Sequence, residues 1–400
     1  MERLKRVLYV GMITTDTYGK VVGEKAYAGA AARKMTSVVC AMRSVGQRAI
    51  ILSLPFVGTQ AKRALYPPVV TSDGKVPAVF LATLRSKYLR KLFVPFFLAV
   101  FAWRRVSVCD TVILYNHAVE YLPALAILRL KGVKVVQDIE DAPTVDEGGM
   151  RGVLNRVSFA VTFRFTEPRK MVVAEHVAKE LKLDDYVVIR GVALNDRGLA
   201  GLCNTAKWED LQAGGELKLH YGGTLIPDTG IDLFCESIEL LAHNEGRLDR
   251  RVVFKVTGVG ELGKIRTLQE RIQTHRKVNV ELLPELSMAD YVALIDTCHG
   301  SLSLKRPESS MSNTTFPSKV IEITSAGVAL VSTRLGDVVS LFNDESVFFL
   351  QHYDAVDLVD IIVDMAQASG RVERVAKAGL DVCSQTFSAK AIGEKMARLI

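Results

Sequence analysis

Residues 314–327 carry the most specific chemical pattern in the sequence. The stretch reads Thr-Thr-Phe-Pro-Ser-Lys-Val-Ile-Glu-Ile-Thr-Ser-Ala-Gly, and an apolar run follows it. Thr314 or Thr315 suits a helix cap, Pro317 suits a first helical turn, and Gly327 suits the position just beyond a helix end. The pattern therefore predicts a short helix of about two to three turns.

The start of this helix is suited to bind an anion. Backbone N–H groups near Ser318 would point at the ligand, and Lys319 would add a full positive charge. Glu322 lies four residues beyond Ser318, about 6 Å along a helix, which is roughly the step from a nucleotide's phosphates to its ribose hydroxyls. The spacing alone also fits an ordinary ion pair between Lys319 and Glu322 on a solvated helix face.

Four polar residues follow two apolar runs in the first half of the chain. Asn116 and His117 come directly after residues 111–115, and Glu140 and Asp141 come after residues 133–138. Open α/β sheets bind ligands at the carboxyl ends of their strands, so we expect these side chains to orient a substrate. Each residue alone also fits a turn or a helix cap.

A glycine pattern, Gly258-Val-Gly-Glu-Leu-Gly263, fits the fingerprint of dinucleotide-binding proteins. It follows an apolar run and precedes a helical one, and Glu281 comes 18 residues after its last glycine. An NAD-dependent oxidoreductase that uses Gly258, Gly260 and Gly263 is therefore an alternative function. Against it, the run would form the second strand of its domain, whereas the fingerprint normally follows the first.

Short β-rich runs alternate with helical stretches, which is the pattern of doubly wound α/β domains. In a first series we expect a helix over residues 28–44 and strands near 6–11, 48–53, 111–115, 133–138 and 187–189. In a second series we expect strands near 217–223, 252–256, 278–283, 300–304, 329–331 and 347–350. Two series in 400 residues predict two domains, at about 100–200 residues each.

The helix motif resembles an element of a known enzyme family. Residues Phe316 to Glu322, followed by Ser325-Ala-Gly327, are similar to the P-S-K-x-x-E-Y-x-A-x-G element of retaining glycosyltransferases of family 4, a variant of their E-x7-E motif. Tyr221-Gly-Gly-Thr-Leu225 and Gly230-Ile-Asp-Leu-Phe234 resemble the Y-x-G-x-L…G-I-D-x-L run that opens the family's C-terminal lobe. In the first half the match is thinner, over residues 131–141.

This resemblance implies the GT-B fold, an α/β architecture in which two Rossmann-like, doubly wound domains face a central cleft. It implies sugar transfer from a nucleotide-diphosphate sugar to an acceptor, with retention at the anomeric carbon and with neither a metal nor another cofactor. The expected divisions are an N-terminal acceptor domain over 1–195, a linker over 196–215, a C-terminal donor domain over 216–383, and a helix over 384–400 that returns to the first domain.

The site residues expected from the resemblance and from the strand ends fall into three groups. Catalytic roles are assigned to Glu140, Asp141, His117 and Lys319. Donor binding is assigned to Gly223, Thr224, Gly258, Arg306, Ser318, Lys319 and Glu322, with Glu322 holding the ribose. Gly29 and Asn116 are assigned to the acceptor side, and no residue is assigned to a metal.

The sequence departs from the family pattern at four positions. The first Glu of E-x7-E is replaced by Thr314, and the Arg and Lys that usually grip the donor diphosphate are replaced by Thr224 and Thr229. Glu140 stands where the family has a His near the transferred sugar. A second alternative is therefore a catalytically degenerate relative that binds a nucleotide or a membrane.

The composition and charge fit a folded chain with two different halves. Apolar residues make up 49% of the chain and charged residues 24%, which excludes disordered and collagenous classes. Six cysteines without a C-x-x-C pair argue against a zinc site and a disulfide framework. Residues 1–200 hold 30 Lys and Arg against 17 Asp and Glu, whereas residues 201–400 hold 21 against 27. The basic half is expected to face an anionic partner.

Residues 85–105 are the candidate for contact with a membrane. The apolar run 92–103 is too short for a span of about 20 residues, but basic residues flank it at both ends, as in helices that lie in a membrane interface. A buried core helix with snorkelling basic ends fits equally well. We expect a cytoplasmic location, peripheral at the inner face of the plasma membrane, and a glycan or polyprenol-linked acceptor in surface polysaccharide synthesis. Nucleic acid is not expected, because no recognition module is present.

Overall fold

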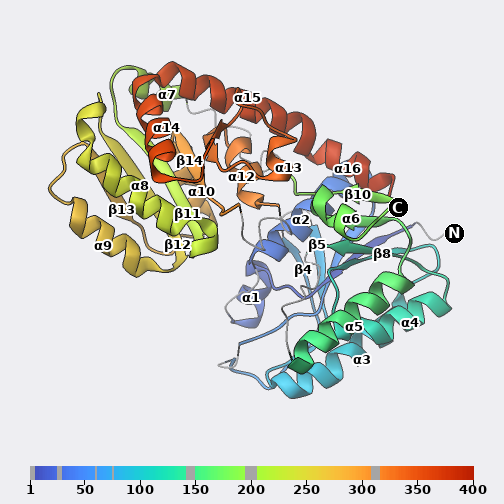
Figure 1. Cartoon of the computed structure of the whole chain (residues 1–400). Coiled ribbons are helices and arrows are strands. Elements are labelled where there is room, and N and C mark those ends of the chain that lie inside the picture. Colours follow the sequence, from blue (N-terminus) through green and yellow to red (C-terminus); the bar gives the residue numbers. More distant parts are fainter. Residues whose placement is uncertain are drawn as a thin grey trace. The chain divides into compact units, whose positions relative to one another are not determined.

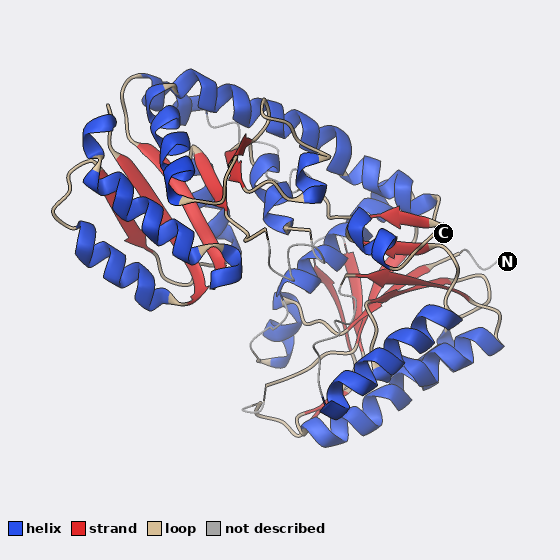
Figure 2. Ribbon diagram, viewed as in Figure 1, coloured by secondary structure: helices blue, strands red, loops and turns tan. Residues whose placement is uncertain are grey.

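The computed structural model describes residues 5–24, 29–58, 61–73, 76–140, 149–193, 205–307 and 316–400. These residues form two compact units (Figure 1). Unit 1 comprises Met1–Val192 and Ala389–Ile400, and unit 2 comprises Ala193–Ser388. In each unit a mainly parallel sheet is covered by helices (Figure 2), which is the arrangement that the alternating sequence pattern predicts.

The main sheet of unit 1 has eight strands in the order β10-β9-β8-β7-β1-β2-β5-β4. All neighbours are parallel except β4 and β5, which are antiparallel. The strands are β1 (Val7–Gly11), β2 (Ala49–Ser53), β4 (Val69–Asp73), β5 (Val76–Phe80), β7 (Thr111–Tyr115), β8 (Lys134–Ile139), β9 (Lys170–Val172) and β10 (Tyr186–Val188), and a separate antiparallel pair is formed by β3 (Leu65–Tyr66) and β6 (Thr83–Leu84).

Helices cover the sheet of unit 1 and contribute to its apolar core. They are α1 (Asp16–Val22), α2 (Gly29–Ser44), α3 (Lys87–Arg105), η1 (Val119–Tyr121), α4 (Leu122–Leu130), α5 (Gly149–Phe165), α6 (Glu175–Glu180) and α16 (Ala389–Ala397). Apolar side chains of α3 and α4 pack with β1, β7 and β8 in one buried cluster. The final helix, α16, packs on α2 and so belongs to unit 1.

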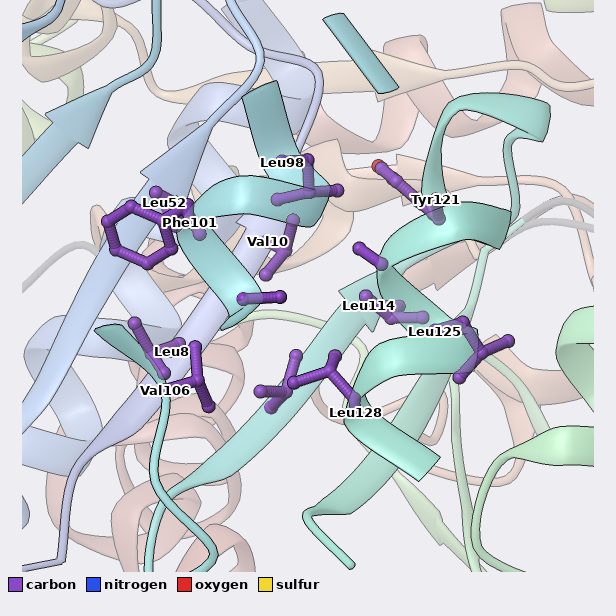
Figure 3. Close-up of a pocket in the computed structure, with 13 residues that line it drawn as sticks. Leu8, Val10, Leu52, Leu98, Phe101, Val106, Leu114, Tyr121, Leu125 and Leu128 are labelled. Atoms are coloured by element: carbon purple, nitrogen blue, oxygen red, sulfur yellow. The ribbon is translucent and has the colours of Figure 1, made fainter. Parts of the chain in front are cut away.

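A small apolar cavity of about 10 Å³ lies within this cluster (Figure 3). Leu8, Val10 and Leu114 line it from the sheet, and Leu98 and Leu125 line it from α3 and α4. A space this small and this apolar does not hold an ordered water, because a water needs polar partners. One face of α3 is therefore ordinary protein core.

Unit 2 contains a six-stranded, fully parallel sheet in the order β13-β12-β11-β14-β15-β16. Its strands are β11 (Leu217–Leu225), β12 (Val252–Gly260), β13 (Val278–Leu282), β14 (Gly300–Ser303), β15 (Ala329–Ser332) and β16 (Phe348–Phe349). Its helices are α7 (Thr205–Gln212), η3 (Pro227–Thr229), α8 (Ile231–His243), η4 (Glu245–Arg247), α9 (Leu262–Ile272), α10 (Met288–Thr297), α12 (Ser318–Ser325), α13 (Gly336–Val339), α14 (Ala355–Gln367) and α15 (Ser369–Phe387).

All strands expected from the sequence are present, and most of their ends are shifted by one to four residues. Five strands of unit 1 were not expected, namely β3, β4, β5, β6 and β9. The expected linker 196–215 lies partly outside the described residues, and its second part contains α7, whose Trp208 and Leu211 are buried in the core of unit 2. Among the described residues, every helix is too short or too polar to span a bilayer.

Candidate functional site

The carboxyl ends of β11 and β12 bring two glycines into direct backbone contact. Gly223 and Gly258 are paired in the parallel ladder and have φ angles of 108° and 127°, which disfavour any residue with a side chain. A Cβ atom at Gly258 would collide with the backbone of Gly223. The strand ends are therefore bare backbone, and an incoming ligand can approach them closely.

Lys319 extends over this bare backbone from α12. A Cβ atom at Gly223 would lie only 2.7 Å from Cε of Lys319 and closer still to its Nζ, so the ammonium group occupies the space above the glycine. Lys319 is in the first turn of α12, next to Ser318, the first residue of the helix. The structure thus joins two predicted donor residues, Gly223 and Lys319, at one point.

The start of α12 differs from the expected one. The N-cap is Pro317 rather than Thr314 or Thr315, and no side chain caps the helix among the described residues. Thr314 and Thr315 lie outside those residues, and of Ser318 only the backbone is described. Since proline has no side-chain acceptor, the side chain of Pro317 does not cap the N–H groups at the start of the helix. Gly327 follows the helix with φ 65°, as predicted for the residue beyond its end.

A buried histidine lies beneath Lys319 and was not singled out from the sequence. His220 on β11 contacts Oγ of Ser301 through Nδ1 and Oγ1 of Thr257 through Nε2, each at 2.9 Å. Burial, together with the charge of Lys319, lowers the pKa of His220 to about 3. The imidazole is therefore neutral at physiological pH, and it links β11 to β12 and β14 below the ligand-facing backbone.

The two threonines that replace the family's Arg and Lys shape a turn after β11. Oγ1 of Thr229 donates to the carbonyl of Thr224 at 2.5 Å and accepts from the N–H of Ile226 at 3.1 Å. The hydroxyl of Tyr221 donates to the carbonyl of Thr229 at 3.2 Å. The side chain of Thr229 thus stabilises the loop through the backbone of Thr224 and Ile226, and neither threonine supplies positive charge.

Lys305 and Arg306 supply positive charge near the same turn. The backbone N–H of Arg306 donates to the carbonyl of Asp228 at 2.9 Å, and the Arg306 side chain is exposed. Lys305 is buried, and burial lowers the pKa of its ammonium group to about 8, although Asp228 opposes the shift. Lys305 was not identified from the sequence. The feature that could have identified it is its position two residues beyond the end of the strand β14.

Glu322 is half-buried and lies one turn beyond Lys319 on α12. Its backbone carbonyl accepts a hydrogen bond from the hydroxyl of Ser325 at 3.0 Å, within the same helix. Residues three apart share a helix face, so the carboxylate of Glu322 and the ammonium group of Lys319 leave α12 on the same side. This placement keeps the expected step between a phosphate-binding and a ribose-binding group.

The glycine fingerprint 258–263 does not have the geometry of a dinucleotide site. Gly258 and Gly260 lie within β12, where they pair with Gly223 and Leu225 of β11, rather than in a turn between strand and helix. Glu281, the acidic residue that completes the fingerprint, pairs with Lys255 at 2.6 Å. These glycines permit close contact between two strands, so the interpretation as a dinucleotide fingerprint loses its structural basis.

In unit 1 the ends of β7 and β8 bring Asn116 and Glu140 together. Asn116 has φ 58°, and its N–H donates to the carbonyl of Asp138 at 2.7 Å. Its side-chain oxygen accepts from the N–H of Glu140 at 2.7 Å. The left-handed backbone of Asn116 therefore fixes the position of Glu140 at the strand end.

A buried charge network holds the side chain of Glu140. Lys34 on α2 pairs with Glu140 and lies 3.3 Å from Oδ2 of the fully buried Asp138. The hydroxyl of Tyr9 also donates to Asp138, and burial beside this carboxylate raises the pKa of Tyr9 well above its ordinary value. Lys34 was missed from the sequence, because its partners are over 100 residues away.

The remaining predicted residues of unit 1 are less closely associated. Nε2 of His117 and Oδ1 of Asn155 on α5 are 2.8 Å apart, and the ring of Phe159 meets the imidazole edge-on at 5.1 Å. Gly29 is the first residue of α2, the helix that carries Lys34. Asp141 lies outside the described residues.

Comparison with known proteins shows the fold. Residues 233–398 match the model of a family described as glycosyl transferase-like. The chain is similar in structure to a glycosyltransferase from Rickettsia africae, with a TM-score of 0.64, 13% identity and coverage of 99% of this chain and 97% of that one. It is similar to HepE from Anabaena in complex with UDP, with a TM-score of 0.62, 12% identity and coverage of 98% and 99%.

Sucrose-phosphate synthase from Thermosynechococcus elongatus is also similar, with a TM-score of 0.64, 12% identity and coverage of 99% and 98%. No curated protein matches the chain significantly. These similarities extend over nearly the whole chain and over both sheets. The chain therefore has the GT-B fold, with two Rossmann-like α/β domains, as the motif resemblance implies.

Proposed function

We propose that this protein is a glycosyltransferase that moves a sugar from a nucleotide-diphosphate sugar to an acceptor with retention at the anomeric carbon. One observation carries the proposal: in a GT-B fold, Lys319 extends from the start of α12 over the bare backbone at Gly223. Matches to a glycosyl transferase-like family and to HepE in complex with UDP support the same reaction class.

The chemistry follows from the charge that develops on the departing diphosphate. The bond between the anomeric carbon and the diphosphate oxygen breaks, the acceptor hydroxyl oxygen bonds to the same carbon, and the hydroxyl proton leaves with the diphosphate. Lys319 and the N–H groups at the start of α12 stabilise the negative charge of that leaving group. Lys305 and Arg306 add positive charge, and Glu322 accepts hydrogen bonds from the ribose hydroxyls. Under this proposal the diphosphate charge is met by protein groups, without a metal ion or a further cofactor.

The acceptor is assigned to unit 1, at the ends of β7 and β8. Glu140, held by Lys34 and Asn116, is positioned to orient a sugar hydroxyl, with His117 and Asp141 nearby in the sequence. We assign a glycan or polyprenol-linked acceptor in surface polysaccharide synthesis. The basic segment 85–105 supports a peripheral position at the inner face of the plasma membrane, because a lipid-linked acceptor is presented there.

Nucleotide-sugar binding tests the donor site. Isothermal titration against a panel of nucleotide sugars should show binding to the wild-type chain, and Lys319→Ala should weaken it about 10- to 100-fold, because a charge-assisted contact to phosphate is lost. Glu322→Ala should weaken binding less, by about tenfold. Lys264→Ala is the control, since Lys264 pairs with Asp232 on exposed surface of the same unit. Unchanged affinity for Lys319→Ala would refute the donor assignment.

A turnover assay distinguishes an enzyme from a degenerate relative. The family's Arg and Lys are replaced by Thr224 and Thr229, which carry no charge, and the hydroxyl of Thr229 bonds to the backbone of a turn, which favours this second candidate. Nucleotide release is measured with a lipid-linked acceptor, using the donor selected by the binding screen. Release that depends on Glu140 supports the transferase, whereas nucleotide binding without release over the acceptor panel supports the degenerate protein.

A further inference from the structure

Helix α3 has two apolar faces, and only one of them is buried. Val94, Leu98 and Ala102 are packed in the core beside the cavity of Figure 3. On the opposite side, Tyr88 is 85% exposed, Leu92 68%, Phe96 61% and Trp103 64%. The sequence allowed two interpretations of residues 85–105, a core helix and an interfacial helix. One face of α3 fits the first interpretation and the opposite face fits the second. Large apolar side chains at helical spacing on a solvent face indicate an interaction surface.

Helix α5 carries a second exposed apolar stripe, which the sequence analysis did not identify. Met150, Val153, Leu154 and Val157 are about half exposed or more, and their spacing places them on one face of the helix. Helix α4 contacts both α3 and α5 (Figure 1). Leu130, the last residue of α4, is exposed. We call the outer faces of α3, α4 and α5 the three-helix surface.

The charged residues of α3, α4 and α5 have one sign, and the acidic Glu167, which pairs with Arg129, lies just beyond α5. Helices α3, α4 and α5 contain no Asp or Glu in 45 residues, although the chain's overall content of 44 in 400 would place about five there. They contain nine Lys and Arg. Arg85 and Arg90 donate to the carbonyls of Ala61 and Val57, so Lys87 and Lys91 are the more available cations at the start of α3.

A groove beside α3 adds a place for a hydrocarbon chain. It has a volume of about 270 Å³ and is lined by Phe96, Phe97 and Val100 of α3 and by Pro68 and Leu81 from the edge of the sheet. Arg104 and Arg105 also line it. An apolar trough with adjacent guanidinium groups matches a lipid, whose chain is apolar and whose phosphate is anionic.

We infer that the three-helix surface docks on an anionic lipid bilayer, with α3 and α5 both entering the interface. This inference rests on the peripheral location proposed above and deepens it, because it names the partner and adds α5 and the groove to residues 85–105. A second copy of the chain fits less well, since a twofold contact would oppose like charges with no acidic residue on these helices to pair with them.

Co-sedimentation with vesicles tests the inference. The probes are vesicles of phosphatidylcholine with about 30% phosphatidylglycerol and vesicles of phosphatidylcholine alone. We expect the wild type to bind the anionic vesicles at least about tenfold more tightly. Leu92→Ser with Phe96→Ser should weaken binding about tenfold or more, and Val153→Ser with Val157→Ser should weaken it about threefold to tenfold.

The control is Val356→Ser, at an exposed position of α14 in unit 2, which should leave vesicle binding unchanged. Wild-type affinity of the α5 variant would overturn the role of α5, and failure of the wild type to sediment would overturn the surface as a whole. If the chain formed a concentration-dependent dimer that the α5 variant abolished, the three-helix surface would bind a second copy of the chain, and the inference of membrane docking would be overturned.

Nucleotide-sugar titration of the same variants without vesicles separates this inference from the proposed function. The substituted side chains are exposed, so nucleotide affinity and thermal melting should stay at wild-type values. Vesicle binding without any nucleotide-sugar binding would refute the proposed function and leave the docking surface standing. Nucleotide-sugar binding without vesicle binding would refute the docking surface and leave the proposed function standing.

Discussion

At the residue scale, the contact between Gly223 and Gly258 determines which ligand the carboxyl ends of β11 and β12 can accept. The same glycine, Gly258, would be a turn residue in a dinucleotide site, but here it is a strand residue that lets two backbones touch. The bare surface that results lies under Lys319, and under the proposed function it binds the donor phosphates. Glycine spacing alone could not separate these two roles.

Substitution of two glycines of the fingerprint should therefore change the stability of unit 2 in different ways. Gly258→Ala places a Cβ against Gly223 at a φ of 127°, and we expect a loss of about 2–4 kcal/mol in the stability of unit 2 together with loss of nucleotide binding. Gly263→Ala meets no atom within 4 Å and lies in α9, so it should be neutral or stabilising by up to about 1 kcal/mol. Urea unfolding measures both; equal losses would contradict the strand-contact role.

His220 predicts how stability depends on pH. Its pKa is about 3 in the folded state, against 6.5 for an unperturbed histidine, so below pH 6.5 the unfolded state binds a proton that the folded state does not. The stabilisation is fully present above pH 6.5 and is lost as the pH falls toward 3, at up to about 1.4 kcal/mol per pH unit. His220→Gln should remove this dependence.

Urea unfolding at pH 7.5, 6 and 5 measures this contribution. The difference in unfolding free energy between wild type and His220→Gln should shrink as the pH falls, because only the wild type loses the histidine contribution. His243→Gln, at an exposed position of α8, is the matched control for the substitution itself. If the unfolding free energy of wild type and of His220→Gln changed with pH in parallel, His220 would have the same pKa in the folded and unfolded states, which would contradict the prediction.

At the element scale, the sequence predicts the strands that have long apolar runs and misses those whose pattern is interrupted. β7 was predicted to the residue, because Thr111–Tyr115 is a continuous apolar run between polar residues. β5 contains Pro77, which argues against a strand, yet parallel pairing with β2 joins β5 to the sheet, and the edge strand β4 pairs with its other side. β9 has three residues, too few to show any periodicity.

The same limit applies to the site elements. The strand ends at 116–117 and at 140 and the helix at 318–325 follow from local patterns of capping and alternation, so Asn116, Glu140 and Lys319 were within reach of the sequence. Lys34 and His220 were not, because their partners come from strands far away in the sequence and only the folded sheets bring them together. Long-range pairing carries no local signal.

At the scale of the whole molecule, the two units have opposite charge. Unit 1 contains 32 Lys and Arg against 17 Asp and Glu, whereas unit 2 contains 19 against 27. A nucleotide-diphosphate sugar is anionic, yet its proposed site is in the acidic unit, so its binding must depend on the local cations at α12 and after β14 rather than on net charge. The excess positive charge of unit 1 remains available to a large anionic surface.

This division predicts two separate patterns of protection in hydrogen exchange. A saturating nucleoside diphosphate, about 100 times its Kd, stabilises the bound form by about 2.7 kcal/mol, which slows exchange through the corresponding openings about 100-fold. With UDP as probe, the slowing should appear in residues 217–225, 252–260 and 318–325 of unit 2, while residues 87–105 and 149–165 keep their rates. Anionic vesicles should give the opposite pattern, because α3 and α5 lose contact with water when they enter the interface. Protection of 111–115 and 134–139 by UDP, with no change in unit 2, would instead place the nucleotide on the sheet of unit 1 and refute the assignment of donor and acceptor to the two units.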